Sequence, residues 1–424
     1  MTAWEAPLAA APVSGRLTVP GSKSTTARAY LLAGLADSPS LLHGALEARD
    51  TRLMRTGLTR LGVAFEDTED GAVRVTPPPQ FHGGGTIDVG LAGTVMRFLP
   101  PIAALVAPAT RFVGDPEAAA RPVAPLLQAL ADLGADVSGP HRLPFSVGGP
   151  IRGGRVTLDS SASSQFVSGL LLAGVRYRDG VVVKHSGGPL PSLPHIQRTV
   201  SMLTRRGARV EQPAPLVWQV YPGAITGVVE HIEPDLTNAA SLLAAAVITG
   251  GELTTVWPQD SLQAGDALAA ALAAFGADLR YQDTADGRTL TVTGPERLSG
   301  VDLDLHEVSE LTPVVAALAA AASTRSVIRG VGHIRGHETD RLAALEIELA
   351  ALGANVRQST DGLEFSPGAL HGGVFHTWGD HRLAHAGALL GLITPGVVLD
   401  DVSCTTKTLP DFVALWSELA GSAA

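Results

Sequence analysis

The chain has 424 residues, 45% of them hydrophobic and 17% charged, which is typical of a well-packed globular protein and too long for one ordinary core. The formal net charge of −10 argues against a nucleic-acid binder, although a local cluster of cations can still bind small anions. No apolar run reaches membrane-spanning length, and residues 1–15 lack the basic cluster and apolar core of a secretory signal.

A helix-like apolar run, a glycine and a strand-like run recur along the whole chain. The glycines lie 68 to 77 residues apart, at Gly62, Gly134, Gly207, Gly276, Gly353 and Gly421. Each predicts a helix that ends at a left-handed glycine and is followed by a strand. Such junctions occur in any α/β protein, but the regular spacing favours six similar units, three in each of two domains.

The sixth unit, with a predicted helix at Phe412–Ala420, has no following strand in this sequence. We expect the N-terminal segment to supply it, with Arg16–Val19 as the strand-like candidate. The N-terminal segment would then share a domain with the C-terminal half of the chain.

The first motif is a strand end, a Pro20-Gly21 turn and a helix that begins near Lys23. Helix amides, hydroxyl groups and a lysine together predict an anion site, with ordinary serine capping as the alternative. The loop is not a Walker A motif, because Ser22 precedes the lysine. Only 3 of the 31 basic residues are lysine, so Lys23 stands out as a charge that arginine does not replace.

Two further motifs follow in the first half of the chain. Gly90 and Gly93 allow backbone to approach a ligand closely, and Arg121 precedes a predicted helix start. A serine run over Asp159–Phe166 leads into a helix from Gln165, which suits a phosphate group or, alternatively, a flexible linker.

The second half carries the remaining motifs. Glu338 and Arg341, three residues apart at a helix start, suit general acid–base chemistry or an ordinary ion pair. Asp380, His381 and Arg382 precede a buried helix, and Lys407 lies at a turn close to the single cysteine, Cys404. His381 and His385 are four apart, but without an HExxH pattern we expect no metal. Lys184, the third lysine, has no suggestive neighbours.

With these six motifs in order, the chain resembles the 5-enolpyruvylshikimate-3-phosphate synthases, from Pro20-Gly21-Ser22-Lys23-Ser24 to Lys407-Thr408-Leu409-Pro410-Asp411. The resemblance implies two similar α/β domains of three βαβαββ units each, closing around the substrates. The chain would cross between them near Val19–Pro20 and Glu233–Leu236, so that residues 20–235 form one domain and residues 1–19 with 236–424 form the other. The resemblance implies transfer of the enolpyruvyl group of phosphoenolpyruvate to the 5-hydroxyl of shikimate 3-phosphate, with no cofactor. It further implies a step of aromatic amino-acid biosynthesis and a target of glyphosate. The single cysteine, which cannot form an intramolecular disulfide, favours a reducing cytoplasm, and we expect a monomer without nucleic-acid or membrane partners.

The resemblance also implies roles for individual residues. The expected catalytic groups are Glu310, Glu338 and Lys23, with Glu338 and Lys23 as competing candidates for moving the C3 proton. The residues expected to bind shikimate 3-phosphate are Lys23, Ser24, Arg28, Ser163, Ser164, Gln165, Ser192, Glu310 and His337. Those expected to bind phosphoenolpyruvate are Lys23, Gly93, Arg121, Gln165, Arg341, Arg382 and Lys407.

Several positions depart from the family pattern. His337 stands where many members have Lys, His333 and Leu91 where many have Asn, and His195 where an aromatic residue is frequent. We expect His337 to bind substrate as a cation or, alternatively, as a neutral hydrogen-bonding group. Two other functions stay open: an enolpyruvyl transferase acting on UDP-N-acetylglucosamine, which would need a cysteine in its first domain, and an inactive binding protein on the same scaffold.

Overall fold

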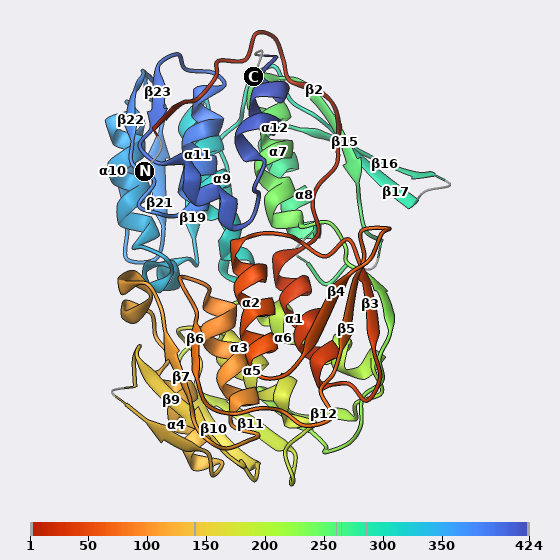
Figure 1. Cartoon of the computed structure of the whole chain (residues 1–424). Coiled ribbons are helices and arrows are strands. Elements are labelled where there is room, and N and C mark those ends of the chain that lie inside the picture. Colours follow the sequence, from red (N-terminus) through yellow and green to blue (C-terminus); the bar gives the residue numbers. More distant parts are fainter. Residues whose placement is uncertain (1–2, 140, 260, 264, 285–286, 422–424) are drawn as a thin grey trace. The chain divides into compact units, whose positions relative to one another are not determined.

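The computed structural model describes residues 3–139, 141–259, 261–263, 265–284 and 287–421 (Figure 1). Residues 1–2 and 422–424, which the predicted second domain includes, lie outside the described residues. The chain forms two compact units, one of Met1–Pro20 with Pro234–Ala424 and one of Gly21–Glu233. Each unit has its own apolar core.

The unit of residues 21–233 contains three sheets with the same strand arrangement. In each sheet two parallel strands are followed by an antiparallel hairpin. The sheets are β14 (Val229–His231), β3 (Ser40–His43), β5 (Val73–Thr76), β4 (Ala64–Asp67); β6 (Thr86–Asp88), β7 (Thr110–Val113), β9 (Phe145–Gly148), β8 (Asp136–Ser138); and β10 (Gly154–Asp159), β11 (Val181–Ser186), β13 (Val217–Val220), β12 (Val210–Ala214).

The other unit repeats this arrangement in two sheets, and its third sheet consists of two parallel strands and one antiparallel strand. Its sheets are β2 (Ser14–Leu17), β15 (Glu252–Val256), β17 (Gly287–Thr293), β16 (Asp278–Thr284); β18 (Asp302–Asp304), β19 (Ser326–Arg329), β21 (Leu363–Ser366), β20 (Asn355–Gln358); and β22 (Gly373–Phe375), β23 (Val397–Leu399), β1 (Trp4–Glu5). The N-terminal segment does complete the sixth sheet, as expected, but through β1. The prediction of Arg16–Val19 for this strand is wrong, because the overlapping strand β2 pairs in parallel with β15 instead.

Each unit contains two classes of helix. Helices that are buried along nearly their whole length pack on one another inside the sheets: α1 (Lys23–Leu35), α3 (Gly93–Ala103) and α5 (Gln165–Gly174) in one unit, α7 (Leu236–Thr249), α9 (Thr312–Ala321) and α11 (His381–Gly391) in the other. The remaining helices are α2 (Arg49–Arg60), α4 (Ala124–Asp132), α6 (Leu193–Arg205), α8 (Gly265–Ala274), α10 (Arg341–Ala351) and α12 (Phe412–Leu419). Short 3-10 turns are η1 (Pro116–Ala120), η2 (His306–Leu311), η3 (Gly332–Gly336) and η4 (Val402–Lys407).

The six repeated glycines follow these remaining helices, as predicted. Each has a positive φ, between 71° at Gly421 and 105° at Gly62. Glycine has no Cβ to clash in this conformation, so it ends the helix and releases the chain into the next strand. Within the described part of the chain, no helix combines the length and apolar character needed to span a membrane.

Candidate active site

Most of the sequence-predicted site residues lie near the N-terminal ends of helices, while Arg121, Glu310 and Lys407 lie at the ends of short 3-10 turns. In the unit of residues 21–233 these are the starts of α1, α3, α5 and α6 and the turn after η1; in the other unit they are η2, η4 and the starts of α10 and α11. Because free amides and the positive end of the helix dipole gather at a helix start, the folding pattern itself produces two sets of anion-attracting positions.

Arg28 is a fully buried cation on α1. Its guanidinium donates to Thr199 Oγ1 at 2.8 Å, to the Ser24 carbonyl at 3.0 Å and to the His195 carbonyl at 3.3 Å. Burial, followed by the charge of Arg198, lowers the pKa of Arg28 to about 9. Two arginines that repel one another in a buried place favour an anion between them.

A second pair of arginines surrounds Gly93 at the start of α3. A Cβ at Gly93 would lie 2.7 Å from Nη2 of Arg121 and 3.0 Å from Nη1 of Arg97, so the missing side chain is what lets both cations approach the helix start. Burial, and then the charge of Arg121, holds the pKa of Arg97 well below its usual value. Arg97 also donates to Gln165 Oε1 at 2.8 Å, which orients the predicted ligand-binding amide.

The lysines differ in their surroundings. Lys23 donates to Asp50 Oδ2 at 3.2 Å, and Asp50 is itself buried at the start of α2. Lys407 is buried in η4, whereas Lys184 is exposed on β11. Lys23 and Lys407, which lie in the motifs, therefore contact carboxylates, whereas Lys184 is exposed; the sequence suggested the same division.

The predicted phosphate-binding serines mark two further helix starts. Ser164 and Ser192 are buried and precede α5 and α6, which pack on one another, and Ser163 Oγ accepts from the Gln165 amide at 3.3 Å. Neither Ser164 nor Ser192 makes a side-chain cap to its own helix. Their hydroxyls are therefore not used for capping these helices.

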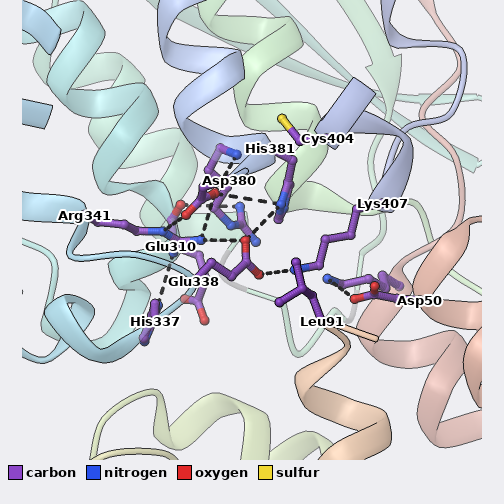
Figure 2. A network of polar contacts seen from close by, with 12 residues as sticks. Asp50, Leu91, Glu310, His337, Glu338, Arg341, Asp380, His381, Cys404 and Lys407 are labelled. Carbon is purple, nitrogen blue, oxygen red and sulfur yellow. Dashed lines mark hydrogen bonds and ion pairs between the residues drawn. The ribbon is translucent and has the colours of Figure 1, made fainter. Parts of the chain in front are cut away.

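Glu338 lies at the centre of a buried ion network in the other unit (Figure 2). Lys407 donates to its Oε1, while His381 Nδ1 lies 3.3 Å and Arg341 Nη2 3.6 Å from its Oε2. Burial raises the pKa of Glu338, but Lys407, His381 and Arg341 outweigh burial and hold the pKa well below its usual value. Glu338 is therefore a carboxylate at neutral pH.

Asp380, to which the sequence assigned no role, holds the network in place. It is fully buried and accepts from Arg341 Nε at 2.6 Å, Arg341 Nη2 at 3.2 Å and the Arg382 amide at 2.9 Å (Figure 2). Such a fork-shaped pair fixes the plane of the guanidinium. Arg382 in turn donates to the Glu310 carbonyl at 3.4 Å, which joins the start of α11 to the expected base.

His337 contacts Arg341, four residues later at the start of α10. Its Nδ1 lies 3.1 Å from Arg341 Nη1. A guanidinium has only donors, so this hydrogen bond requires Nδ1 to accept, and a doubly protonated imidazole has no acceptor. The geometry favours the neutral alternative for His337 over the cationic one.

Glu338, Asp380 and His381 place three ligand atoms within 4.8 Å of one another, a spacing that a metal ion would accept. Two of these residues already bind cationic side chains, since Lys407 contacts Glu338 and Arg341 contacts Asp380. We interpret the cluster as an ion-pair network whose positive charges come from the protein itself.

Four site residues do not emerge from the sequence patterns: Asp50, Arg97, Arg198 and Asp380. Arg97 and Asp380 both lie inside the six motifs, so their position was a usable signal. Asp50 and Arg198 lie outside those motifs, and only the packing of α1 against α2 and α6 brings them beside Lys23 and Arg28.

The chain is similar to known proteins over nearly its whole length. A family model described as EPSP synthase (3-phosphoshikimate 1-carboxyvinyltransferase) matches residues 8–416. A 3-phosphoshikimate 1-carboxyvinyltransferase of Kocuria rhizophila is 48% identical over 99% of this chain and 97% of its own length. Two structures of EPSP synthase from Acinetobacter baumannii have TM-scores of 0.79 at 22% identity; one covers 98% and the other 97% of this chain, and each match spans 97% of the matched chain. At that identity they bear on the fold alone, and they confirm the α/β class.

Proposed function

Because the chain belongs to the EPSP synthase family of 3-phosphoshikimate 1-carboxyvinyltransferases, we propose that its two sets of helix-start residues bind the two anionic substrates of that reaction. The enzyme transfers the enolpyruvyl group of phosphoenolpyruvate to shikimate 3-phosphate and releases phosphate, a step of aromatic amino-acid biosynthesis. The cations of the two sets bind the substrates, and carboxylates beside them move the protons.

The observation that carries the assignment is the excess of buried cations. Arg28 and Arg97 have lowered pKa values, with burial as the first cause and a neighbouring arginine as the second. Both substrates carry phosphate and carboxylate groups, which supply the missing negative charge. We assign shikimate 3-phosphate to Lys23, Ser24, Arg28, Ser163, Ser164, Gln165, Ser192, Glu310 and His337, and phosphoenolpyruvate to Lys23, Gly93, Arg121, Gln165, Arg341, Arg382 and Lys407.

Two carboxylates supply the proton transfers. Glu310 accepts the proton of the 5-hydroxyl as its oxygen adds to C2 of phosphoenolpyruvate, and C3 gains a proton from Glu338. In the resulting ketal, C3 then returns a proton to the Glu338 carboxylate while the C2–O bond to phosphate breaks, which regenerates the double bond and releases phosphate. Each such proton transfer contributes about 10²–10⁴-fold.

Phosphoenolpyruvate binding favours protonation of Glu338. In the free network Lys407, His381 and Arg341 hold its pKa low. A bound anion that contacts Lys407 and Arg341 offsets their field, so the pKa of Glu338 rises toward the range a proton donor needs. Lys23 stays the competing donor, and Lys23 and Lys407 assist phosphate departure.

Phosphate release tests the whole assignment. We expect release from phosphoenolpyruvate only when shikimate 3-phosphate is present, and none with UDP-N-acetylglucosamine. Glu310→Gln and Glu338→Gln are expected to lower kcat at least about 10²-fold, the lower end of the range for a lost general acid or base. Release with the nucleotide sugar, or no release with either acceptor, would favour one of the two alternative functions.

We also infer a monomeric enzyme of the cytoplasm. The single cysteine supports a reducing compartment, because no intramolecular disulfide can form. Burial raises the pKa of the Cys404 thiol to about 12, so it stays protonated and unreactive. Light scattering of the purified protein tests the monomeric state.

A further inference from the structure

We propose that Glu348, which no substrate contact requires, is a positioning residue for phosphoenolpyruvate binding, an inference that rests on the proposed function of Arg341 and Arg382. Glu348 lies on α10 and is 1% exposed. Its carboxylate holds the turn at residues 376–379, which immediately precedes Asp380 and Arg382.

The contacts of Glu348 are directed at that turn. Its Oε2 accepts from the His376 amide at 2.8 Å and from His376 Nδ1 at 3.1 Å, and its Oε1 accepts from Trp378 Nε1 at 3.0 Å. On the other side of the turn, Asp400 Oδ1 accepts from the Thr377 amide at 2.8 Å and from the Thr377 hydroxyl at 2.9 Å. Two carboxylates therefore hold three consecutive residues.

The turn needs such support because its backbone is strained. Trp378 has φ of 54° and Gly379 has φ of 66°, and the Asp380 amide closes the turn onto the Thr377 carbonyl at 2.9 Å. Positive φ at both central positions is typical of a type I′ turn, where Asn-Gly is the usual pair and a bulky residue is unfavourable. A left-handed tryptophan persists only where its surroundings impose it, and the indole contact with Glu348 is that constraint.

One face of helix α10 thereby contacts the segment of residues 376–380 at two points. Arg341 at the helix start binds Asp380, and Glu348, seven residues later, binds His376 and Trp378. Seven residues are two turns, so both side chains leave the same side of the helix. Arg341 and Asp380 sit in the ion network, so loss of the second attachment is expected to let Asp380 and Arg382 shift while the fold is kept.

The test compares two carboxylates of α10. Glu348→Gln exchanges one acceptor oxygen for a donor group that faces other donors, so at least one contact is lost. We expect the KM for phosphoenolpyruvate to rise at least about fivefold, because displacement of a substrate-positioning group costs up to about 10²-fold. The KM for shikimate 3-phosphate is expected to change less than about twofold, since its proposed ligands do not lie on this turn.

Glu346→Gln is the matched control. Glu346 also accepts from a backbone amide and a side chain, those of Gln358 at 2.8 and 2.5 Å, but it ties α10 to β20 away from the network. A merely structural role for Glu348 predicts equal kinetic effects of both variants, and that result overturns the proposal. Trp378→Phe, which removes one donor from a half-exposed side chain, is expected to raise the same KM less, and to have little further effect in Glu348→Gln.

Failure of this inference is distinct from failure of the proposed function. Arg341→Lys is expected to raise the phosphoenolpyruvate KM whatever Glu348 does, so an unchanged value rejects the substrate assignment itself. If Arg341→Lys raises it while Glu348→Gln and Trp378→Phe leave it unchanged, the positioning role is rejected. Should Glu348→Gln not fold, Trp378→Phe alone decides.

Discussion

At the scale of single residues, two of the three lysines contact carboxylates and the third is exposed. Lys407 donates to Glu338 and Lys23 to Asp50, while Lys184 is exposed on a strand. An arginine is larger and cannot place a compact charge at these buried contacts. Lys23→Arg and Lys407→Arg are expected to lower kcat/KM at least about tenfold, or about 1.4 kcal/mol, and Lys184→Arg to be neutral. Equal losses in all three variants would contradict the argument that the rarity of lysine marks functional positions.

Gly93 gives a second prediction at this scale. The methyl group of Gly93→Ala would displace the guanidinium of Arg121, which lies 2.7 Å from the new Cβ. Family members are commonly inhibited by glyphosate, a longer molecule than phosphoenolpyruvate that occupies its site. We therefore expect the inhibition constant of glyphosate to rise by a larger factor than the KM for phosphoenolpyruvate. Steady-state inhibition assays measure both, and equal factors would contradict the explanation.

The contact between His337 and Arg341 gives a third prediction. Because Nδ1 accepts from the guanidinium of Arg341, we expect the imidazole to bind as a neutral group that takes up no proton when shikimate 3-phosphate binds. The binding curves of wild type and His337→Lys should therefore run parallel between about pH 6 and 8, the window of an ordinary histidine. His333, whose pKa is lowered by burial and then by His306, is present in both proteins. Calorimetric curves that diverge with pH would restore the cationic alternative.

What the sequence could predict at this scale followed from the chemistry of single side chains. Lysine, glycine and serine at helix starts could be named as candidates for anion binding, although serine also serves as an ordinary helix cap. Asp380 was not, because a carboxylate before a helix is read first as a cap, and it does cap α11 through the Arg382 amide. Its second role, binding Arg341, joins residues 39 apart in sequence and depends on packing.

At the scale of elements, the contact of Lys407 in η4 with Glu338, in the segment between η3 and α10, is expected to contribute to acid stability. The folded-state pKa of Glu338 is depressed, so its stabilising contribution is present above the unfolded pKa of about 4.3 and is lost as pH falls through the folded value. Lys407→Gln removes the first-ranked opposing charge and raises that folded pKa. We expect this variant to be less stable than wild type at pH 7 and the difference to shrink below about pH 4.3.

Denaturant unfolding at several pH values, followed by circular dichroism, measures this difference. Lys184→Gln, at an exposed position, is the control and should show a difference that does not vary with pH. A constant difference for Lys407→Gln as well would mean that Lys407 does not set the ionisation of Glu338.

Elements also differed in how far the sequence could define them. The glycine that ends each repeating helix was predictable, since one residue type suits the left-handed position. The strand that completes the sixth sheet was not, because Trp4–Glu5 is too short to show an alternating pattern. The longer candidate, Arg16–Val19, overlaps β2, which pairs with β15 in a different sheet.

At the scale of the whole molecule, the chain enters one unit, leaves it at Pro20 and returns at Pro234. The inserted unit is complete in itself, since β14 from its end pairs with β3 from its beginning. The other unit depends on the N-terminal segment. Trp4 pairs with Leu399, the Ala6 amide donates to the Val397 carbonyl at 2.9 Å, and the Trp4 ring meets Phe412 edge-on.

Removal of residues 2–9 should therefore loosen one unit and spare the other. Without β1 the edge of β23 is open, and the close packing of Ala6 against Gly391 at the end of α11 is lost. We expect faster amide hydrogen exchange in residues 373–399 and 412–419 and unchanged exchange in residues 21–233, because sheets that keep all their strands keep their protection. Leu8→Ala, at an exposed position of the same segment, should exchange as wild type does. Equal acceleration in both units would mean that the N-terminal segment stabilises the molecule as one cooperative body, and no acceleration would mean that β1 contributes nothing to the sixth sheet.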